Sequence, residues 1–88
     1  MEIYEDTVYG QILPAEKTKN NMSGVMILVE GSEEYIVESN DMGVELAKYV
    51  DSWVTVGGII KETSRYIRIE VYAYTLEDSW AYQDDDVW

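Results

Sequence analysis

The segment at residues 66–74 places the strongest constraint on the fold, because apolar and polar residues alternate along its length. One side carries Ile67, Ile69, Val71 and Ala73, and the other carries Tyr66, Arg68, Glu70, Tyr72 and Tyr74. A period of two is typical of a β-strand with one buried face. The chain therefore needs a sheet whose apolar face packs against a core.

Four further strands are predicted from β-branched and aromatic runs that lie between turn-forming residues. They cover residues 7–13, Val25–Val29, residues 35–38 and residues 53–60. Pro14 ends the first strand, and residues 15–24 then form a long exposed loop. Gly31 and Ser32 turn the second strand into the third, which predicts a hairpin.

The predicted strand at residues 53–60 contains two adjacent glycines, Gly57 and Gly58. Its buried side is expected to carry Val54, Val56, Gly58 and Ile60. A glycine pair inside a strand indicates a bulge or a sharp bend.

Between the third and fourth strands the apolar period changes to that of a short helix. Its expected buried face is Met42, Leu46, Tyr49 and Val50. Asn40 or Asp41 is placed to cap the first turn. Gly43 weakens the helix, so we expect only two to three turns.

The order of three strands, a helix and two strands resembles the OB-fold, and the resemblance covers residues 7–76. Gly10 and the stretch WVTVGGIIKE resemble the first and fourth strands of short bacterial OB-fold proteins. The resemblance implies a mainly β, five-stranded Greek-key barrel with one short helix between strands three and four. A small SH3-like barrel or an unrelated α+β sheet remains an alternative with the same order.

The length of 88 residues corresponds to one folded domain. We expect the barrel at residues 1–76 and an acidic, tryptophan-containing tail at residues 77–88. The N-terminus has neither the basic nor the apolar region of a signal peptide, and no apolar run approaches the ~20 residues of a membrane span. With no cysteine in the chain, these features favour a cytoplasmic protein that is not embedded in a membrane.

The absence of histidine as well as cysteine excludes imidazole and thiolate metal sites, cysteine nucleophiles and a histidine general base. Carboxylate pairs are plentiful, but none has the spacing of a calcium loop or a partner that indicates acid–base chemistry. We therefore expect a non-enzymatic protein without a cofactor, a metal or catalytic residues.

The 18 acidic and 6 basic side chains give a formal charge of -12, which disfavours polyanionic partners. The first six residues contribute -3 and residues 77–88 contribute -5, so we expect two acidic ends that can be removed. The OB-fold resemblance implies a ligand site flanked by the loops between strands one and two and between strands four and five. Most of the cations fall on or beside these loops.

The expected ligand-binding residues combine those cations with outward aromatic side chains on which bases can stack. They are Lys17, Lys19, Lys61, Arg65, Tyr66, Arg68 and Tyr72. Strands two and three, however, bring Glu30, Glu33, Glu34 and Glu38 to the centre of that site. A protein partner is therefore the favoured interpretation, with single-stranded DNA or RNA as the alternative and self-association through strand edges as a third.

The C-terminal run of Asp84, Asp85 and Asp86 precedes Val87 and Trp88. It resembles the acidic tip of bacterial single-stranded-DNA-binding proteins, although Val87-Trp88 replaces the Ile-Pro-Phe ending of that family. The resemblance implies that Trp88 enters an apolar pocket of a partner protein while the aspartates meet basic residues. The alternative is that Trp80 or Trp88 packs back on the barrel.

Overall fold

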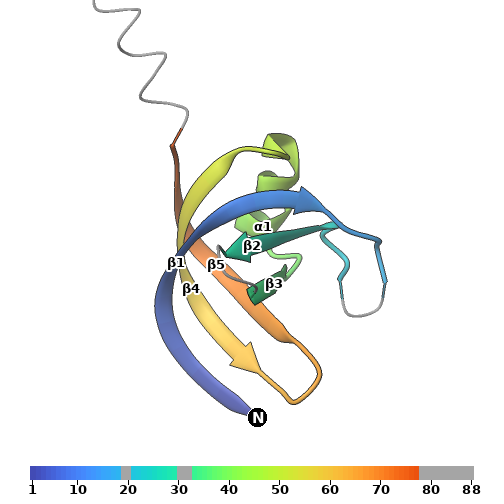
Figure 1. Ribbon diagram of the computed structural model, residues 1–88, viewed down its shortest axis with the longest axis vertical. Helices are drawn as coiled ribbons and strands as arrows, with labels where there is room; N and C mark the ends of the chain where they lie inside the picture. Colours follow the sequence, from blue (N-terminus) through green and yellow to red (C-terminus); the bar gives the residue numbers. More distant parts are fainter. Residues whose placement is uncertain (19–20, 30–32, 78–88) are drawn as a thin grey trace, which may run out of the picture.

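Five β-strands and one short α-helix make up most of the computed structural model, which describes residues 1–18, 21–29 and 33–77 (Figure 1). The elements are β1 (Glu2–Pro14), β2 (Val25–Val29), β3 (Glu33–Val37), α1 (Asp41–Leu46), the 3-10 turn η1 (Ala47–Tyr49), β4 (Trp53–Glu62) and β5 (Ile67–Leu76). The predicted mainly β chain, with one short helix between the third and fourth strands, is confirmed.

The strands are hydrogen-bonded in the order β1-β2-β3-β5-β4, and β4 pairs back with β1, so the sheet closes on itself. All pairs are antiparallel except β3 with β5. A parallel pair needs a long connection, which α1 and β4 supply here. The long, curved β1 closes the sheet because it pairs with β4 over residues 2–11 and with β2 over residues 11–14 (Figure 1).

The core lies inside the closed sheet and is made of the inward-facing residues of the strands together with one helix residue. It comprises Val8, Ile12, Val25, Ile27, Tyr35, Val37, Leu46, Val54, Val56, Ile60, Ile69 and Val71. Each buried aliphatic side chain of this kind contributes roughly 1.5–3 kcal/mol to folding. The inward side predicted for β4 is confirmed, because Val54, Val56, Gly58 and Ile60 are all buried. On β3, the inward residues are Tyr35 and Val37.

The predicted alternation of β5 is wrong beyond Val71. Gly58 pairs with Val71, whereas Gly57 pairs with Ala73, so Tyr72 is the extra residue of a β-bulge. The bulge expected at the glycine pair is present, but the inserted residue belongs to β5. As a result Ala73 is exposed, and Tyr74, which we expected on the outer face, packs against the core.

The predicted buried face of the helix is only partly correct. Leu46 is fully buried, but Met42 and Val50 are exposed, and Gly43 is buried in their place. A Cβ atom at Gly43 would collide with the Glu38 carbonyl oxygen and lie 2.9 Å from Val37 Cγ1. Gly43 therefore allows the helix to approach the end of β3 closely. The N-cap of the helix is Asn40, which was predicted together with Asp41 as one of two alternatives.

The first strand begins at Glu2 rather than at the predicted Thr7. Residues 2–6 pair with residues 58–62 of β4. The acidic N-terminal end is thus part of the sheet, so its removal would take away strand pairing as well as charge. Its charged side chains are exposed, so the period-two pattern of a half-buried strand is missing from this part of the sequence.

Candidate functional site

Lys61 and Arg68, two of the predicted ligand-binding cations, are cross-strand partners on β4 and β5. Lys61 Nζ lies 3.2 Å from Glu38 Oε1 and 3.3 Å from Glu70 Oε1. Arg68 Nε lies 3.8 Å from Glu38 Oε2. The hydrogen bond to Glu38 is the main reason that the pKa of Lys61 is raised. The structure brings these two cations together but balances their charge with two carboxylates.

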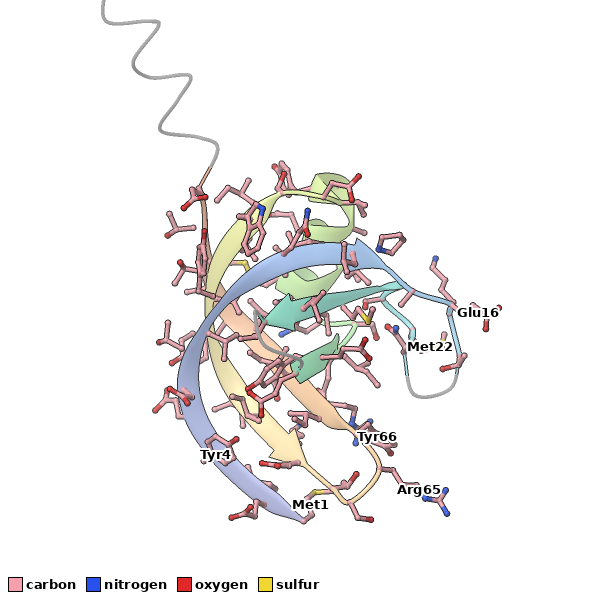
Figure 2. All side chains as sticks on the ribbon, viewed as in Figure 1. Met1, Tyr4, Glu16, Met22, Arg65 and Tyr66 are labelled. Carbon is pink, nitrogen blue, oxygen red and sulfur yellow. The ribbon has the colours of Figure 1, made fainter. Side chains whose placement is uncertain are left out.

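This cluster lines an open hollow of about 500 Å³, whose other residues are Met22, Ser39 and Asn40. Met22 belongs to the connection between β1 and β2 and is 59% exposed (Figure 2). That connection was expected to be wholly exposed, but Ser23 is buried and its hydroxyl donates to the Val37 carbonyl at 2.7 Å. The hollow is lined by charged and polar groups, unlike the mostly apolar pockets that enclose small molecules.

Arg65 and Tyr66 lie at the connection between β4 and β5, where Figure 2 shows them together. Arg65 is exposed, and Tyr66 is half-buried. The Arg68 guanidinium carbon lies 5.4 Å from the centre of the Tyr66 ring, within cation–π range. Arg65 and Tyr66 line a second hollow, of about 380 Å³, together with Glu33, Glu34 and Glu62. The surface around Arg65 is therefore predominantly acidic.

Tyr72 and Lys17 are the remaining described residues of the predicted site; Tyr72 lies further along β5, and Lys17 lies in the connection between β1 and β2. Tyr72 is 49% exposed, and its hydroxyl donates to Glu5 Oε2 at 2.7 Å. It follows Tyr66 by six residues, so at the ordinary rise of a strand the two Cα atoms are at most roughly 20 Å apart. Lys17 is exposed in the connection between β1 and β2, where its alkyl chain lies beside Gly24. Tyr66 and Tyr72 thus contact different neighbours, Arg68 and Glu5 respectively.

Several predicted residues lie outside the described part of the chain. They are Lys19 in the first loop and Asp84, Asp85, Asp86 and Trp88 in the tail, together with Trp80. At the expected domain boundary, the Glu77 N–H still donates to the Trp53 carbonyl at 2.9 Å, and its carboxylate accepts from the Tyr9 hydroxyl at 2.8 Å.

Tyrosine–glutamate pairs are a feature of the surface that the sequence analysis missed. The pairs, each with the hydroxyl as donor, are Tyr4–Glu62, Tyr9–Glu77, Tyr35–Glu33, Tyr72–Glu5 and Tyr74–Glu45. Burial raises the pKa of Tyr35 to about 12, and the hydrogen bond to Glu5 raises the pKa of Tyr72. In these pairs, tyrosine hydroxyls rather than cations bind the carboxylates. Eight tyrosines in an acidic chain were the available signal, but in every pair except Tyr35–Glu33 the partners are distant in sequence.

The first half of β1 carries three exposed carboxylates within five residues. Glu2, Glu5 and Asp6 are exposed on this half, as are Glu33 and Glu34 on β3. In the described residues, none of these five carboxylates forms a salt bridge with a cation. A surface of this kind attracts cationic groups.

No known family model, curated protein or solved structure matches this chain. Within the described ranges, no helix has the length and apolar character needed to cross a membrane. In the same residues, no group of three or more carboxylates is placed to share a metal ion.

Proposed function

We propose that this chain is a non-enzymatic binding module with an OB-like fold, and that it binds another protein through a cationic segment of that partner. The strand order, the parallel β3–β5 pair and the helix between β3 and β4 support the OB-like assignment, because a Greek-key barrel of this class is expected to combine them. The cytoplasm is the proposed location.

The observation that carries this proposal is the pairing of Lys61 and Arg68 with Glu38 and Glu70. These two cations belong to the surface expected to hold phosphates, and their charge is already balanced by carboxylates. The carboxylates of β1 and β3, in contrast, have no cationic partner among the described residues. Electrostatic complementarity therefore favours a basic partner over an acidic one.

Single-stranded nucleic acid is the second candidate, supported by the exposed Arg65 beside Tyr66. Phosphates at this site would have to displace Glu38 from two cations at once. The surrounding Glu33, Glu34 and Glu62 add repulsion. The proposed contribution of the tail is independent of this surface: Asp84, Asp85, Asp86 and Trp88 would dock on a partner protein.

An NMR titration at low ionic strength tests the proposal. The labelled protein is mixed with a lysine-rich peptide, with the same peptide carrying glutamate for lysine, and with a mixed-sequence single-stranded oligonucleotide. We expect only the lysine-rich peptide to shift resonances, with affinity that falls as salt is added. If the oligonucleotide shifted resonances at residues 61–68 and the lysine-rich peptide shifted none, the proposed function would be wrong. Nucleic-acid binding would then be the better assignment.

A further inference from the structure

Among the described residues, the first half of β1 has a strand on only one of its two sides. β1 pairs with β4 from Glu2 to Gln11, but its pairing with β2 begins only at Gln11. No strand in the described part of the chain occupies the other side of residues 2–7. Figure 1 shows this half of β1 extending away from β2 and β3, alongside β4. An unpaired edge of this kind can add a further strand.

The hydrogen-bonding parity of β1 identifies the backbone groups that face the open side. The Ile12 N–H donates to the Ser52 carbonyl, on the β4 side, whereas the Ala15 N–H donates to Gly24, on the β2 side. Backbone groups alternate between the two sides of a strand. The N–H and carbonyl groups of Ile3, Glu5 and Thr7 therefore face the open edge.

Asp6 protects this edge in the structure. The Thr7 N–H donates to the Asp6 carboxylate, Oδ1, at 2.7 Å, in the place where an added strand would offer a carbonyl. An incoming carbonyl that replaced Oδ1 would release the carboxylate to pair with a cationic side chain of the same strand. Displacement of the Asp6 carboxylate from the Thr7 N–H thus links the pairing of the added strand to the binding of its cationic side chain.

The side chains along the edge distinguish between possible occupants. Ile3 is 62% exposed and Tyr4 is 39% exposed, which leaves apolar surface for alternate residues of an added strand. Antiparallel pairing of two copies centred on Glu5 would place the two Glu5 side chains opposite each other, and like charges in that position destabilise a pair. A strand with lysine or arginine at those positions is complementary instead.

We propose that the open edge of β1 at residues 3–7 binds an extended, lysine- or arginine-bearing segment of a partner protein as an additional β-strand. The segment donates to and accepts from the backbone of Ile3, Glu5 and Thr7, and its cations pair with Glu2, Glu5 and Asp6. This inference rests on the proposed binding of a cationic protein segment, and it specifies where and in what conformation that segment binds.

The test uses the full chain and a short peptide of alternating lysine and valine, compared with the same peptide N-methylated on alternate residues. N-methylation leaves the charge unchanged but removes the peptide donors that face β1. With two or three backbone hydrogen bonds lost, we expect binding to weaken roughly 30- to 150-fold. Binding of the unmethylated peptide should also slow hydrogen exchange at the Ile3 and Glu5 amides.

Ile3→Pro supplies an independent variant, because proline removes only an N–H that faces the open edge. Ile3→Val is the matched control, and thermal unfolding of both variants reports whether the fold is retained. We expect weaker peptide binding for Ile3→Pro and unchanged binding for Ile3→Val. Should Ile3→Pro fail to fold, amide exchange in the unaltered protein still tests the inference.

Equal binding of the two peptides, or protection only at amides away from β1, would overturn the added-strand inference while the proposed function stood. Failure of any lysine-rich peptide to bind would overturn both. Light scattering that showed dimers with protected Ile3 and Glu5 amides would assign the edge to a second copy and would also overturn the inference.

Discussion

Asn40 links the short helix to the core, and its replacement provides the sharpest test of how the fold is held together. Its side-chain oxygen accepts from the Gly43 N–H at 2.8 Å, and its side-chain nitrogen donates to the Val71 carbonyl at 2.8 Å. Val71 is fully buried. Asn40→Ala removes both hydrogen bonds, whereas Asn40→Asp retains an acceptor for Gly43 but has no donor for Val71.

The expected cost of Asn40→Ala is the sum of two effects. Loss of an N-cap costs about 1 kcal/mol. Leaving the buried Val71 carbonyl without a donor costs about 1–3 kcal/mol. We therefore expect the free energy of unfolding to fall by roughly 2–4 kcal/mol, which is a large share of the roughly 5–15 kcal/mol typical of a folded domain. Asn40→Asp should lose roughly the 1–3 kcal/mol of the second effect.

Urea unfolding followed by circular dichroism measures these differences from the midpoint and the slope. A loss of about 2 kcal/mol corresponds to a melting temperature at least about 8 °C lower. A loss below about 0.5 kcal/mol for Asn40→Ala, the range of ordinary surface substitutions, would refute the reasoning. Equal losses for the alanine and aspartate variants would show that the cap contributes nothing and that the Val71 bond carries the whole effect.

Three further predictions concern the helix, the tyrosines and the N-terminal strand. Gly43→Ala should lower the urea midpoint, because the added Cβ collides with the Glu38 carbonyl oxygen. This effect opposes the helix propensity of alanine, which favours an isolated helix by about 1 kcal/mol over glycine. A raised midpoint would contradict this account of the contact. The pKa of Tyr35 is raised to about 12 by burial, so its neutral form stabilises the fold fully below about pH 10, and this contribution is lost as pH rises from about 10 to 12. Tyrosinate absorbance recorded with circular dichroism should show this loss. Tyr35→Phe should remove the part of the titration that belongs to Tyr35. If every tyrosine titrated near pH 10 while the protein stayed folded, the raised pKa of Tyr35 would be contradicted. Deletion of residues 1–6 should destabilise the protein and speed amide exchange at residues 58–62, because β4 loses its partner there; an unchanged urea midpoint would show that this part of the ladder is dispensable.

The candidate site was only partly accessible from the sequence. Lys61 and Arg68 could be placed near the same surface because each falls next to or within a predicted strand. Their partner Glu38 directly follows β3 and is far from both cations in the sequence. It lies beside Arg68 because β3 and β5 form a parallel pair. Counting the cations along the chain therefore overestimated the positive charge around Lys61 and Arg68, because the distant Glu38 was not included. The Tyr72–Glu5 pair was missed for the same reason, since its residues lie on β5 and β1.

The positions of β2, β3 and β4 and the cap at Asn40 follow from local chemistry that the sequence contains. Burial of alternate residues and capping of a first turn each depend on neighbours within a few positions. The tertiary structure alone establishes which strand lies beside which, and with it the bulge at Tyr72, the contact made by Gly43 and the carboxylates beside Lys61. Among the described residues, it also leaves residues 2–7 with an open edge, because the pairing of β2 with β1 is found at residues 11–14 of β1. A local pattern specifies which side chains are to be buried, whereas strand register determines which distant groups meet.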